Sequence, residues 1–354
     1  MNSGLARVRQ EQARRGRRLL ALTGLLCLAA LFAVGAGSVP LSAVEVASVV
    51  GARLWPSLNW PEWPATHEAI VWNIRMPRVA LAILVGASLA MAGAAFQGMF
   101  RNPMADPFVI GVSSGAAFGA ALALYLGQRI GWPGFGGVPA CAFAGALLAV
   151  TVVYRLAKSD GRIPVMTLLL AGIAVAAVLS GLVSFLIFLT DDTVGGVVFW
   201  LMGSLNGASW PRVGVLALYF VAGAGVLAGA GRALNALLLG EEPAAALGID
   251  VEAVKRRILI GGTLLTAAAV SVSGIIGFVG LIVPHMIRLV AGPDHRFLLP
   301  ASVVGGGLFL LAADTLARTI IAPADLPVGI LTSLAGGPFF LYLLRRRGRY
   351  LRGI

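Results

Sequence analysis

Long apolar runs separated by short polar or charged segments make up most of this chain. A run of about 17 to 25 apolar residues is long enough to cross a bilayer as a helix. Such runs lie at residues 19–36, 76–99, 111–128, 138–156, 164–189, 211–229, 254–276, 277–291, 298–321 and 326–344. The run at 277–291 is short and begins at Gly277. The pattern predicts an all-α polytopic membrane protein, with about ten transmembrane helices in a single domain that spans residues 1–354.

Composition agrees with this class. Of the 354 residues, 58% are hydrophobic and only 12% are charged, whereas soluble domains carry about 25% charged residues. The mean hydropathy is +0.91. Cys27 and Cys141 both lie inside apolar runs, which favours small packing residues over a disulfide or a metal-binding pair.

Orientation in the membrane explains the formal net charge of +12. Residues 1–18 carry six arginines, and the apolar run after them is longer than the core of a typical signal peptide, which favours an uncleaved first helix over a cleaved signal. If the N-terminus is cytoplasmic and ten helices alternate, 21 of the 27 basic residues fall on the cytoplasmic side, as the positive-inside rule requires. Both termini are therefore expected in the cytoplasm, and the charge needs no nucleic-acid partner.

Two segments on the outer side are long. Residues 41–73 contain Trp55, Trp60, Trp63 and Trp72, which suits a loop whose aromatic rings lie in the membrane interface. Residues 190–210 are apolar enough to include a short re-entrant or interfacial helix.

The cytoplasmic segment at residues 231–257 differs from every other internal segment. It is long, and it mixes both signs of charge with apolar residues. A transmembrane chain that is driven from the cytoplasm must offer a soluble partner a contact site, and this segment is the natural candidate.

Two catalytic motifs are incomplete. A phosphate-binding loop requires GxxxxGK followed by Ser or Thr, and neither Lys158 nor Lys255 stands in that pattern. His67 begins a partial HExxH motif, but Val71 stands where the second histidine is required. We therefore expect no ATP hydrolysis by that route and no protease zinc in this chain.

A third motif has two interpretations. Gly111, Ser113 and Gly115 match the GxSxG pattern of serine hydrolases, and His285 is the one histidine in an apolar run. Gly111, Gly115 and Gly119 also form a ridge of small residues that lets helices approach closely. Because glycine is frequent here, packing within the chain is the favoured interpretation.

Charged residues are sparse within the runs. Asp314 and Arg318 stand four residues apart, so they can pair on one helix face, or Arg318 can serve at the outer surface. No chain of acidic or histidine residues runs across the spans, which disfavours a proton-driven carrier.

A series of short motifs runs from Arg75 to near the C-terminus. They are Arg75–Arg78, Gly93–Gln97, Arg101–Pro107, Gly111–Gly115, Ala245–Gly248, Gly277–His285 with Arg288, Asp294–Arg296, Ala313–Asp314, Leu326–Gly329 and Gly337–Leu341. Together these motifs resemble the FecCD/BtuC-type family, the permease subunits of bacterial ABC importers for iron-siderophore complexes, haem and cobalamin. The resemblance covers nearly the whole chain from Arg75 onward.

This resemblance implies a BtuC-like (type II) importer fold and a set of partners. The chain is expected to pair with a second permease copy, with the substrate path at their interface. Two cytoplasmic ABC ATPase subunits would hold ATP and Mg, so that this chain binds no cofactor itself. A periplasmic or lipid-anchored binding protein would deliver the substrate, and the location would be the bacterial cytoplasmic (inner) membrane.

The resemblance also implies roles for individual residues. Contact with the ATPase would involve short helices at Gly240, Glu241, Glu242, Pro243, Ala244, Ala245, Leu247 and Gly248. Contact with the binding protein would involve Arg75, Arg78 and Arg318, since the arginine fork pairs with carboxylates; snorkelling at the interface is the alternative for Arg75 and Arg78.

Other family positions imply a path and an architecture. The path would be lined by residues 168–188 and 328–344, with the polar exceptions Ser180, Ser184, Thr332 and Ser333. The signature residues with architectural roles are Asn102, Pro103, Asp106, Pro107, Gly280, Pro284 and His285.

The predicted function is that of a permease subunit that imports an iron chelate, haem or cobalamin, energised by a separate ATPase. An ion-coupled secondary transporter and an intramembrane serine hydrolase are the alternatives. The residues do not choose the substrate, nor do they decide between a homodimer and a pair with a similar permease.

Overall fold

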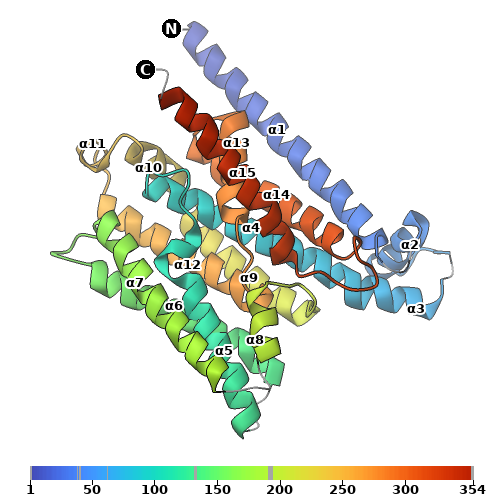
Figure 1. The fold of residues 1–354 in the computed structure, drawn as a ribbon. Helices are drawn as coiled ribbons and strands as arrows, with labels where there is room; N and C mark the ends of the chain where they lie inside the picture. Colours follow the sequence, from blue (N-terminus) through green and yellow to red (C-terminus); the bar gives the residue numbers. More distant parts are fainter. Residues whose placement is uncertain are drawn as a thin grey trace.

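The computed structural model describes residues 2–37, 39, 41–61, 63–130, 134–189 and 194–351, which are almost entirely helical (Figure 1). The longer helices are α1 (Asn2–Gly35), α4 (Met76–Met99), α5 (Val112–Ile130), α6 (Gly134–Ala157), α7 (Val165–Phe188), α9 (Trp210–Leu227), α12 (Val251–Ser273), α13 (Val279–Ala291), α14 (His295–Ala317) and α15 (Val328–Leu351). Each apolar run of the sequence coincides with one of these helices. The shorter elements are α2 (Ala43–Leu54), α3 (Ala65–Glu68), the π-helical η1 (Ala69–Arg75), the 3-10 helix η2 (Pro107–Ile110), α8 (Val194–Leu201), α10 (Ala230–Leu237) and α11 (Glu241–Ala246).

Six helical segments in the described part of the chain are long and apolar enough to cross a membrane, judged by length and composition. They are Ala13–Gly35, Ala65–Met99, Gly137–Ala157, Val165–Phe188, Trp210–Leu227 and His295–Ala317. Shorter apolar helices lie at Val112–Gly127, Val279–Ala291 and Val328–Tyr342. The chain is therefore a multi-pass membrane protein, while the number of crossings and the side of each terminus stay predictions.

Helix α4 is the most buried of the long helices, because small residues let its neighbours approach closely. A Cβ atom on Gly86 would lie 2.1 Å from the carbonyl oxygen of Gly306 in α14. A Cβ atom on Gly93 would lie 1.9 Å from the carbonyl oxygen of Gly280 in α13. No side chain larger than hydrogen fits at these crossings, so glycine sets the distance between the helices.

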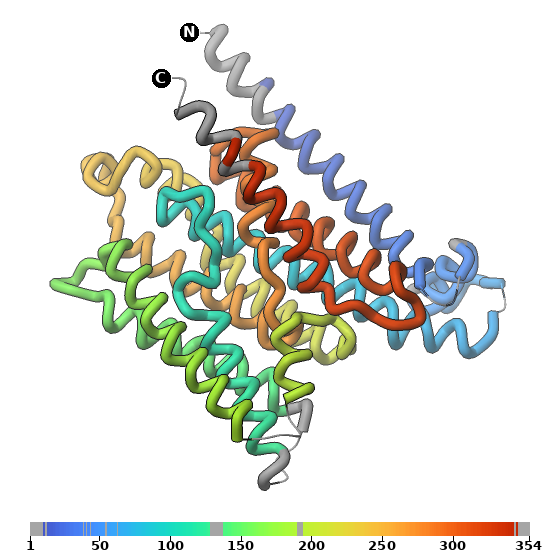
Figure 2. The backbone as a smooth tube through the Cα atoms, viewed as in Figure 1, coloured from blue at the N-terminus to red at the C-terminus, as the bar shows by residue number. Residues whose placement is uncertain are grey.

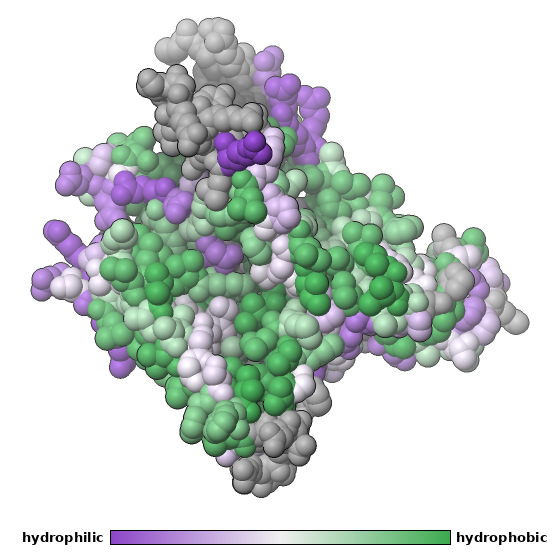
Figure 3. All heavy atoms as spheres, viewed as in Figure 1, coloured by the Kyte–Doolittle hydropathy of each residue, from purple (hydrophilic) through white to green (hydrophobic). Residues whose placement is uncertain are grey.

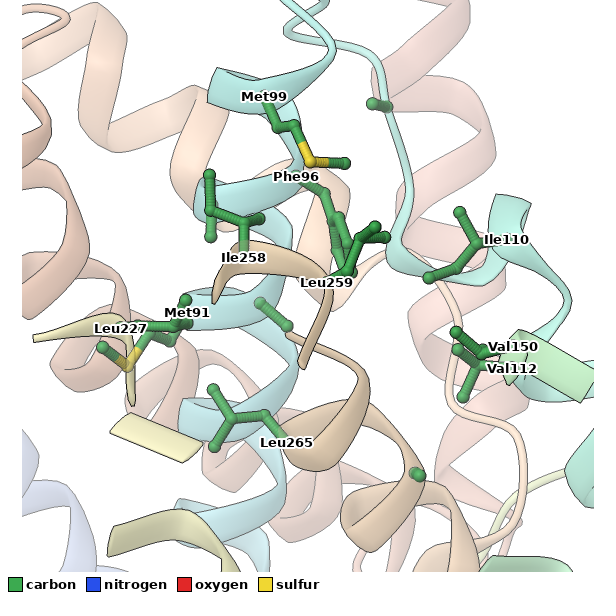
Figure 4. Packing of buried hydrophobic residues seen from close by; sticks show 14 of the residues in the cluster. Met91, Phe96, Met99, Ile110, Val112, Val150, Leu227, Ile258, Leu259 and Leu265 are labelled. Atoms are coloured by element: carbon green, nitrogen blue, oxygen red, sulfur yellow. The ribbon is translucent and has the colours of Figure 1, made fainter. Parts of the chain in front are cut away.

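Larger apolar side chains fill the space on the other side of α4. Phe96 of α4 is fully buried, as are Ile258 and Leu265 of α12. Figure 4 shows these residues together, with Met91 and Met99 extending from α4 toward the same cluster. This packing joins α4 to α12 and fixes the position of the segment that precedes α12.

The glycine ridge at the start of α5 packs within the chain. A Cβ atom on Gly115 would lie 2.4 Å from the carbonyl oxygen of Gly145 in α6, and one on Gly119 would lie 2.1 Å from that of Cys141. Gly111 instead ends η2 in the left-handed region, with φ of +86°. The packing interpretation is therefore confirmed for Gly115 and Gly119.

Ser113 follows a 3-10 turn rather than a strand, so it does not occupy the strained strand-to-helix turn of a hydrolase.

The outer segments are more helical than the sequence predicts. Residues 41–73 were expected to form a loop, and that prediction is wrong for most of them, since α2, α3 and η1 occupy the segment. Ser42 starts α2 with a capping box, in which its hydroxyl accepts the N–H of Glu45 and its own N–H donates to the Glu45 carboxylate. The Trp72 and Trp210 rings lie 5.4 Å apart, and Trp210 Nε1 donates to the Trp72 carbonyl at 2.9 Å.

The short helix expected within residues 190–210 is present as α8, and residues 190–193 lie outside the described part.

The two ends of the bundle differ. Figure 1 shows the N-terminal part of α1 and the C-terminal part of α15 at the same end as α10 and α11, with α2 and α3 at the opposite end. Helix α1 runs along the outside of α14 (Figure 2). This arrangement agrees with the prediction that both termini and residues 231–257 share one side of the membrane.

Much of the visible surface is apolar, and hydrophilic residues gather toward the end that carries α10 and α11 (Figure 3). Helix α7 contributes a long exposed apolar face, made of Met166, Leu170, Ile173, Val178, Phe185 and Phe188. A soluble monomer rarely exposes so large an apolar patch. Lipid or a second subunit is expected to cover it.

Candidate functional site

Two short helices separate α9 from α12, and glycine and proline determine where α11 lies. Gly240 has a φ of +123°, a region that favours glycine, and it directs the chain into α11. Pro243 lies in the first turn of α11, where the helix needs no N–H donor. Gly248, with φ of +81°, lets the chain turn back after the helix. Asp250 then begins α12 by accepting the N–H of Ala253 at 2.9 Å.

The outward face of this segment is apolar. Leu239 is 68% exposed and Leu247 is 67% exposed, and Pro243 and Ala245 are exposed between them. Burying one leucine side chain stabilises a complex by about 1.5–3 kcal/mol. We name Leu239, Glu242, Pro243, Ala245 and Leu247 the α11 surface, and its composition suits a protein contact.

The two neighbouring glutamates, which the sequence treats alike, have different surroundings. Glu242 is exposed, whereas the carboxylate of Glu241 lies 2.7 Å from the ammonium group of Lys255 in α12. Ala244 is fully buried beneath the α11 surface. Glu241 and Ala244 therefore hold α11 on the bundle, and Glu242 stays available to a partner.

Helix α10 is fixed to α14 through Asn235. Its side chain donates to Asp294 at 2.7 Å and accepts the N–H of His295 at 2.8 Å. Asp294 also pairs with Arg296 at 3.0 Å and with Arg15 of α1. The hydrogen bonds from Arg296, and then those from Asn235 and Arg15, hold the pKa of the Asp294 carboxyl well below its usual value, despite partial desolvation. This cluster joins α1, α10 and α14 at the end of the bundle that carries α11.

The turn after α4 is built by side chains that bind their own backbone. Asn102 accepts the N–H of Met104 at 3.0 Å, and Asp106 accepts that of Phe108 at 2.8 Å. Such Asx turns replace backbone hydrogen bonds where the helix has ended. Burial raises the pKa of Asp106 to about 6, while the bond from Phe108 acts in the opposite direction.

Pro103 and Pro107 belong to the same turn. Pro103 is part-buried, and Pro107 is a buried residue that starts η2, the position where a missing N–H costs least. These contacts support the architectural role predicted for the signature around Asn102.

The contacts of the signature on α13 also support the architectural role predicted for it. Gly280 makes the close crossing with α4, and the side-chain amide of Gln97 donates to the carbonyl groups of Gly280 and Leu281 at 3.2 Å. Pro284 lies buried inside α13. His285 is 8% exposed and meets the ring of Phe339 in α15 edge-on, with centroids 6.4 Å apart.

At the opposite end of the bundle, two arginines bind the last carbonyl groups of α1. Arg75 donates to the carbonyl oxygens of Val34 at 2.9 Å and Gly35 at 2.8 Å, and Arg318 donates to that of Ala33. The final carbonyl groups of a helix lack intrahelical partners and form its negative end. Arg75 is only 5% exposed and Arg318 only 6%.

The third arginine of this group pairs with two carboxylates. Arg78 Nε lies 3.0 Å from Asp314 Oδ1, and Arg78 Nη1 lies 2.8 Å from Asp325 Oδ2. Arg318 Nε lies 3.8 Å from Asp314, so the predicted pair on α14 is present. Arg78 is 9% exposed, and the Asp325 side chain is 33% exposed.

Arg75, Arg78 and Arg318, which the family resemblance assigns to the binding-protein contact, are all buried in this structure. Each is buried because polar groups inside the same chain already accept its hydrogen bonds. Contact of these three side chains with a binding protein requires those bonds to open, and it stays a prediction.

The four polar residues expected along a path divide into two groups. Ser180, Ser184 and Ser333 are exposed, and the Ser184 hydroxyl donates to the Ser180 carbonyl at 3.1 Å. Thr332 is fully buried and donates to the Gly329 carbonyl at 3.1 Å. Thr332 therefore does not line an open surface of this protomer, because its hydroxyl lies within the bundle.

The sequence assigns no contact to Lys255, Asp325, Gln97 or Asn235, each of which binds a group that is distant in the chain. Lys255 could have been noticed, because it is one of two lysines. Asp325 lies beside the Leu326–Gly329 motif, but nothing in the sequence pairs it with Arg78. In the described part of the chain, no group of three or more histidine, cysteine, aspartate or glutamate residues is placed to hold a metal ion.

Comparison with known proteins agrees with the geometry. The model of the FecCD transport family matches residues 25–346. The cobalamin import system permease protein BtuC of Halobacterium salinarum is 49% identical over 321 residues, covering 89% of this chain and 85% of that protein. The hemin transport system permease protein HmuU of Yersinia pestis is 43% identical over 299 residues, covering 80% and 86%. An inward-facing structure of a metal-chelate type ABC transporter is 31% identical, with a TM-score of 0.81 over 94% of this chain and 99% of that one.

Proposed function

This chain belongs to the FecCD transport family, and we propose that it carries a metal chelate across the bacterial cytoplasmic membrane. It is the permease subunit of an ABC importer, and it is not an enzyme, since the ATPase is a separate subunit. ATPase and binding-protein partners follow from that class. The secondary transporter and the serine hydrolase are therefore set aside.

The proposed substrate is cobalamin, haem or an iron-siderophore complex. The names of two relatives support this class, since one imports cobalamin and the other hemin. In proteoliposomes that contain the whole importer, radiolabelled cyanocobalamin, haemin and a ferric siderophore can be compared directly. ATP-dependent uptake of none of the three would contradict the substrate class.

The proposed ATPase contact is the α11 surface. The observation that carries this proposal is the exposure of Leu239 and Leu247 on a helix that Glu241 and Ala244 hold on the bundle. ATP and Mg would be bound by the ATPase subunits, and this chain would bind no cofactor.

The first prediction tests this contact through Leu247→Glu. Loss of one well-buried apolar contact weakens binding by about 2 kcal/mol, or about 30-fold in Kd. The measurement is the affinity of the purified permease for its ATPase subunit. Arg14→Glu, a charge change at an exposed residue of α1, is the control and should leave the affinity unchanged. Equal affinity of Leu247→Glu and the wild type would remove α11 from the contact.

The proposed assembly is a homodimer of permeases with the path between them. The exposed apolar face of α7 and the exposed residues Ser180, Ser184 and Ser333 support this arrangement. The binding protein is proposed to dock at the end that carries α2 and α3, near Arg78 and the partly exposed Asp325.

A further inference from the structure

Lys255 is a buried lysine whose ammonium group joins three segments of the chain. Its side chain is 3% exposed. The ammonium nitrogen lies 2.7 Å from Glu241 of α11, 3.1 Å from Glu252 of α12, and 3.0 Å from the carbonyl oxygen of Ile163. Ile163 lies in the loop between α6 and α7, immediately before Pro164, which precedes α7. A lysine has three N–H donors, and all three have acceptors here.

Glu252 holds the same loop from the other side. Its second carboxylate oxygen accepts the N–H of Ile163 at 2.9 Å. The N–H and the C=O of Ile163 are thus bound by the two members of one ion pair, and the residue itself is 2% exposed. Figure 1 shows the start of α12 between α11 and the α6–α7 loop. The start of α7 is therefore fastened to α12 and, through Lys255, to α11.

The buried position makes these contacts costly to break. An ammonium group that loses its partners without gaining water pays a large desolvation cost. Displacement of α11 by more than about an ångström would stretch the Lys255–Glu241 contact beyond hydrogen-bond length unless Lys255 follows. Because Lys255 also holds Ile163, the α6–α7 loop must follow as well.

We propose that Lys255 and Glu252 are positioning residues that transmit movement of α11 to the cytoplasmic start of α7. This inference rests on the proposed function, in which the ATPase contacts α11 and α7 lines the path. The link is an ion pair whose two members bind the N–H and the C=O of one residue, Ile163, and it requires no contact between Lys255 and either ATP or substrate.

The test measures whether α7 responds to ATP. In a variant without Cys27 and Cys141, Met166→Cys places a thiol on the first turn of α7, where Met166 is 71% exposed. The complex of this permease with its ATPase is labelled with a maleimide, either without nucleotide or trapped with ATP and vanadate. With Lys255 present, the two labelling rates should differ by about fivefold or more.

The decisive variant is Lys255→Met. In the Lys255→Met complexes that assemble with the ATPase, the two labelling rates should become equal within about twofold, because α11 moves without α7. Arg256→Met, at the exposed neighbouring position of α12, removes the same charge and should keep the nucleotide-dependent difference. Lys255→Arg should restore it in part, since arginine can reach the same acceptors.

Each other result has a defined meaning. A full nucleotide-dependent difference in Lys255→Met overturns the inference, as does equal labelling when Lys255 is present. Loss of ATP hydrolysis in an assembled Lys255→Met complex also overturns it, because Lys255 would then act on the ATPase. If Lys255→Met does not fold, Glu252→Gln replaces it, and an unchanged difference in that variant overturns the inference. Failure of the permease to bind its ATPase with Lys255 present refutes the proposed ATPase contact instead.

Discussion

Backbone carbonyl groups hold several of the buried cations in this protein. Arg75 and Arg318 bind the end of α1, and Lys255 binds Ile163. The end of α1 supplies acceptors that would otherwise lack partners, and Ile163 supplies a carbonyl group from the loop between α6 and α7, so each contact satisfies both the cation and the backbone. At these positions the charged residues join elements, which is a structural role that composition alone would not suggest.

Asp106 and Asp294 are two residues whose protonation should affect stability, in opposite directions. The pKa of Asp106 is raised from 3.8 to about 6 by burial, so between these values the folded protein binds more protons than the unfolded protein. Stability should therefore fall as the pH rises from about 4 to about 6, and should change little above that range. Asp294 acts in the opposite direction: its pKa is lowered, so its contribution is present above its unfolded pKa of 3.8 and is lost at lower pH.

The second prediction uses Asp106→Asn, which keeps an oxygen that can accept the Phe108 N–H but cannot ionise. The wild-type Tm minus the variant Tm should decrease between pH 4 and pH 6.5, and the variant should be the more stable protein at pH 7.5. Thermal unfolding in detergent across this range measures the difference. A difference that is independent of pH would show that Asp106 is not protonated in the folded state.

At the scale of elements, glycine crossings determine how closely the helices pack. Lipid offers no hydrophobic drive for two helices to associate, so close contact between backbones must supply the attraction. The crossings of α4 with α13 and α14 meet this condition.

The third prediction concerns Gly93→Ala. The added methyl group would lie 1.9 Å from the Gly280 carbonyl oxygen, so α4 and α13 must separate, at a cost of about 1–3 kcal/mol. The matched control is Gly225→Ala in α9, where a Cβ atom meets nothing within 4 Å. We expect a lower unfolding temperature for Gly93→Ala alone. Equal unfolding temperatures for the two variants would show that α4 and α13 can accommodate a methyl group at Gly93 and are not packed backbone to backbone there.

At the scale of the whole molecule, α7 has a broad apolar face that no other part of the described chain covers. A second permease copy would cover this face and enclose Ser180 and Ser184, which are exposed on it. The same helix begins beside the clamp formed by Lys255 and Glu252, so one element would connect the ATPase contact with the path.

The fourth prediction tests that pairing with Ser184→Cys in a variant without Cys27 and Cys141. In membranes, a short bismaleimide should join two copies through this position. Val221→Cys on α9, which is 69% exposed, serves as the control and should remain monomeric on a denaturing gel. Efficient cross-linking at position 221 and none at position 184 would place the interface elsewhere.

The sequence alone determined the class, the long helices, the family and the position of the ATPase-contact candidate, because these follow from local properties. Apolar run length predicts spans, and short motifs along the chain carry the resemblance that implies a short helix at residues 240–248. Tertiary structure decided how residues far apart in the chain are paired. Arg78 meets Asp314 and Asp325, and Glu241 meets Lys255, only because the folded helices bring them together. Burial likewise turned Arg75, Arg318 and Thr332 inward, since the free energy of a polar side chain depends on which backbone groups the fold places beside it.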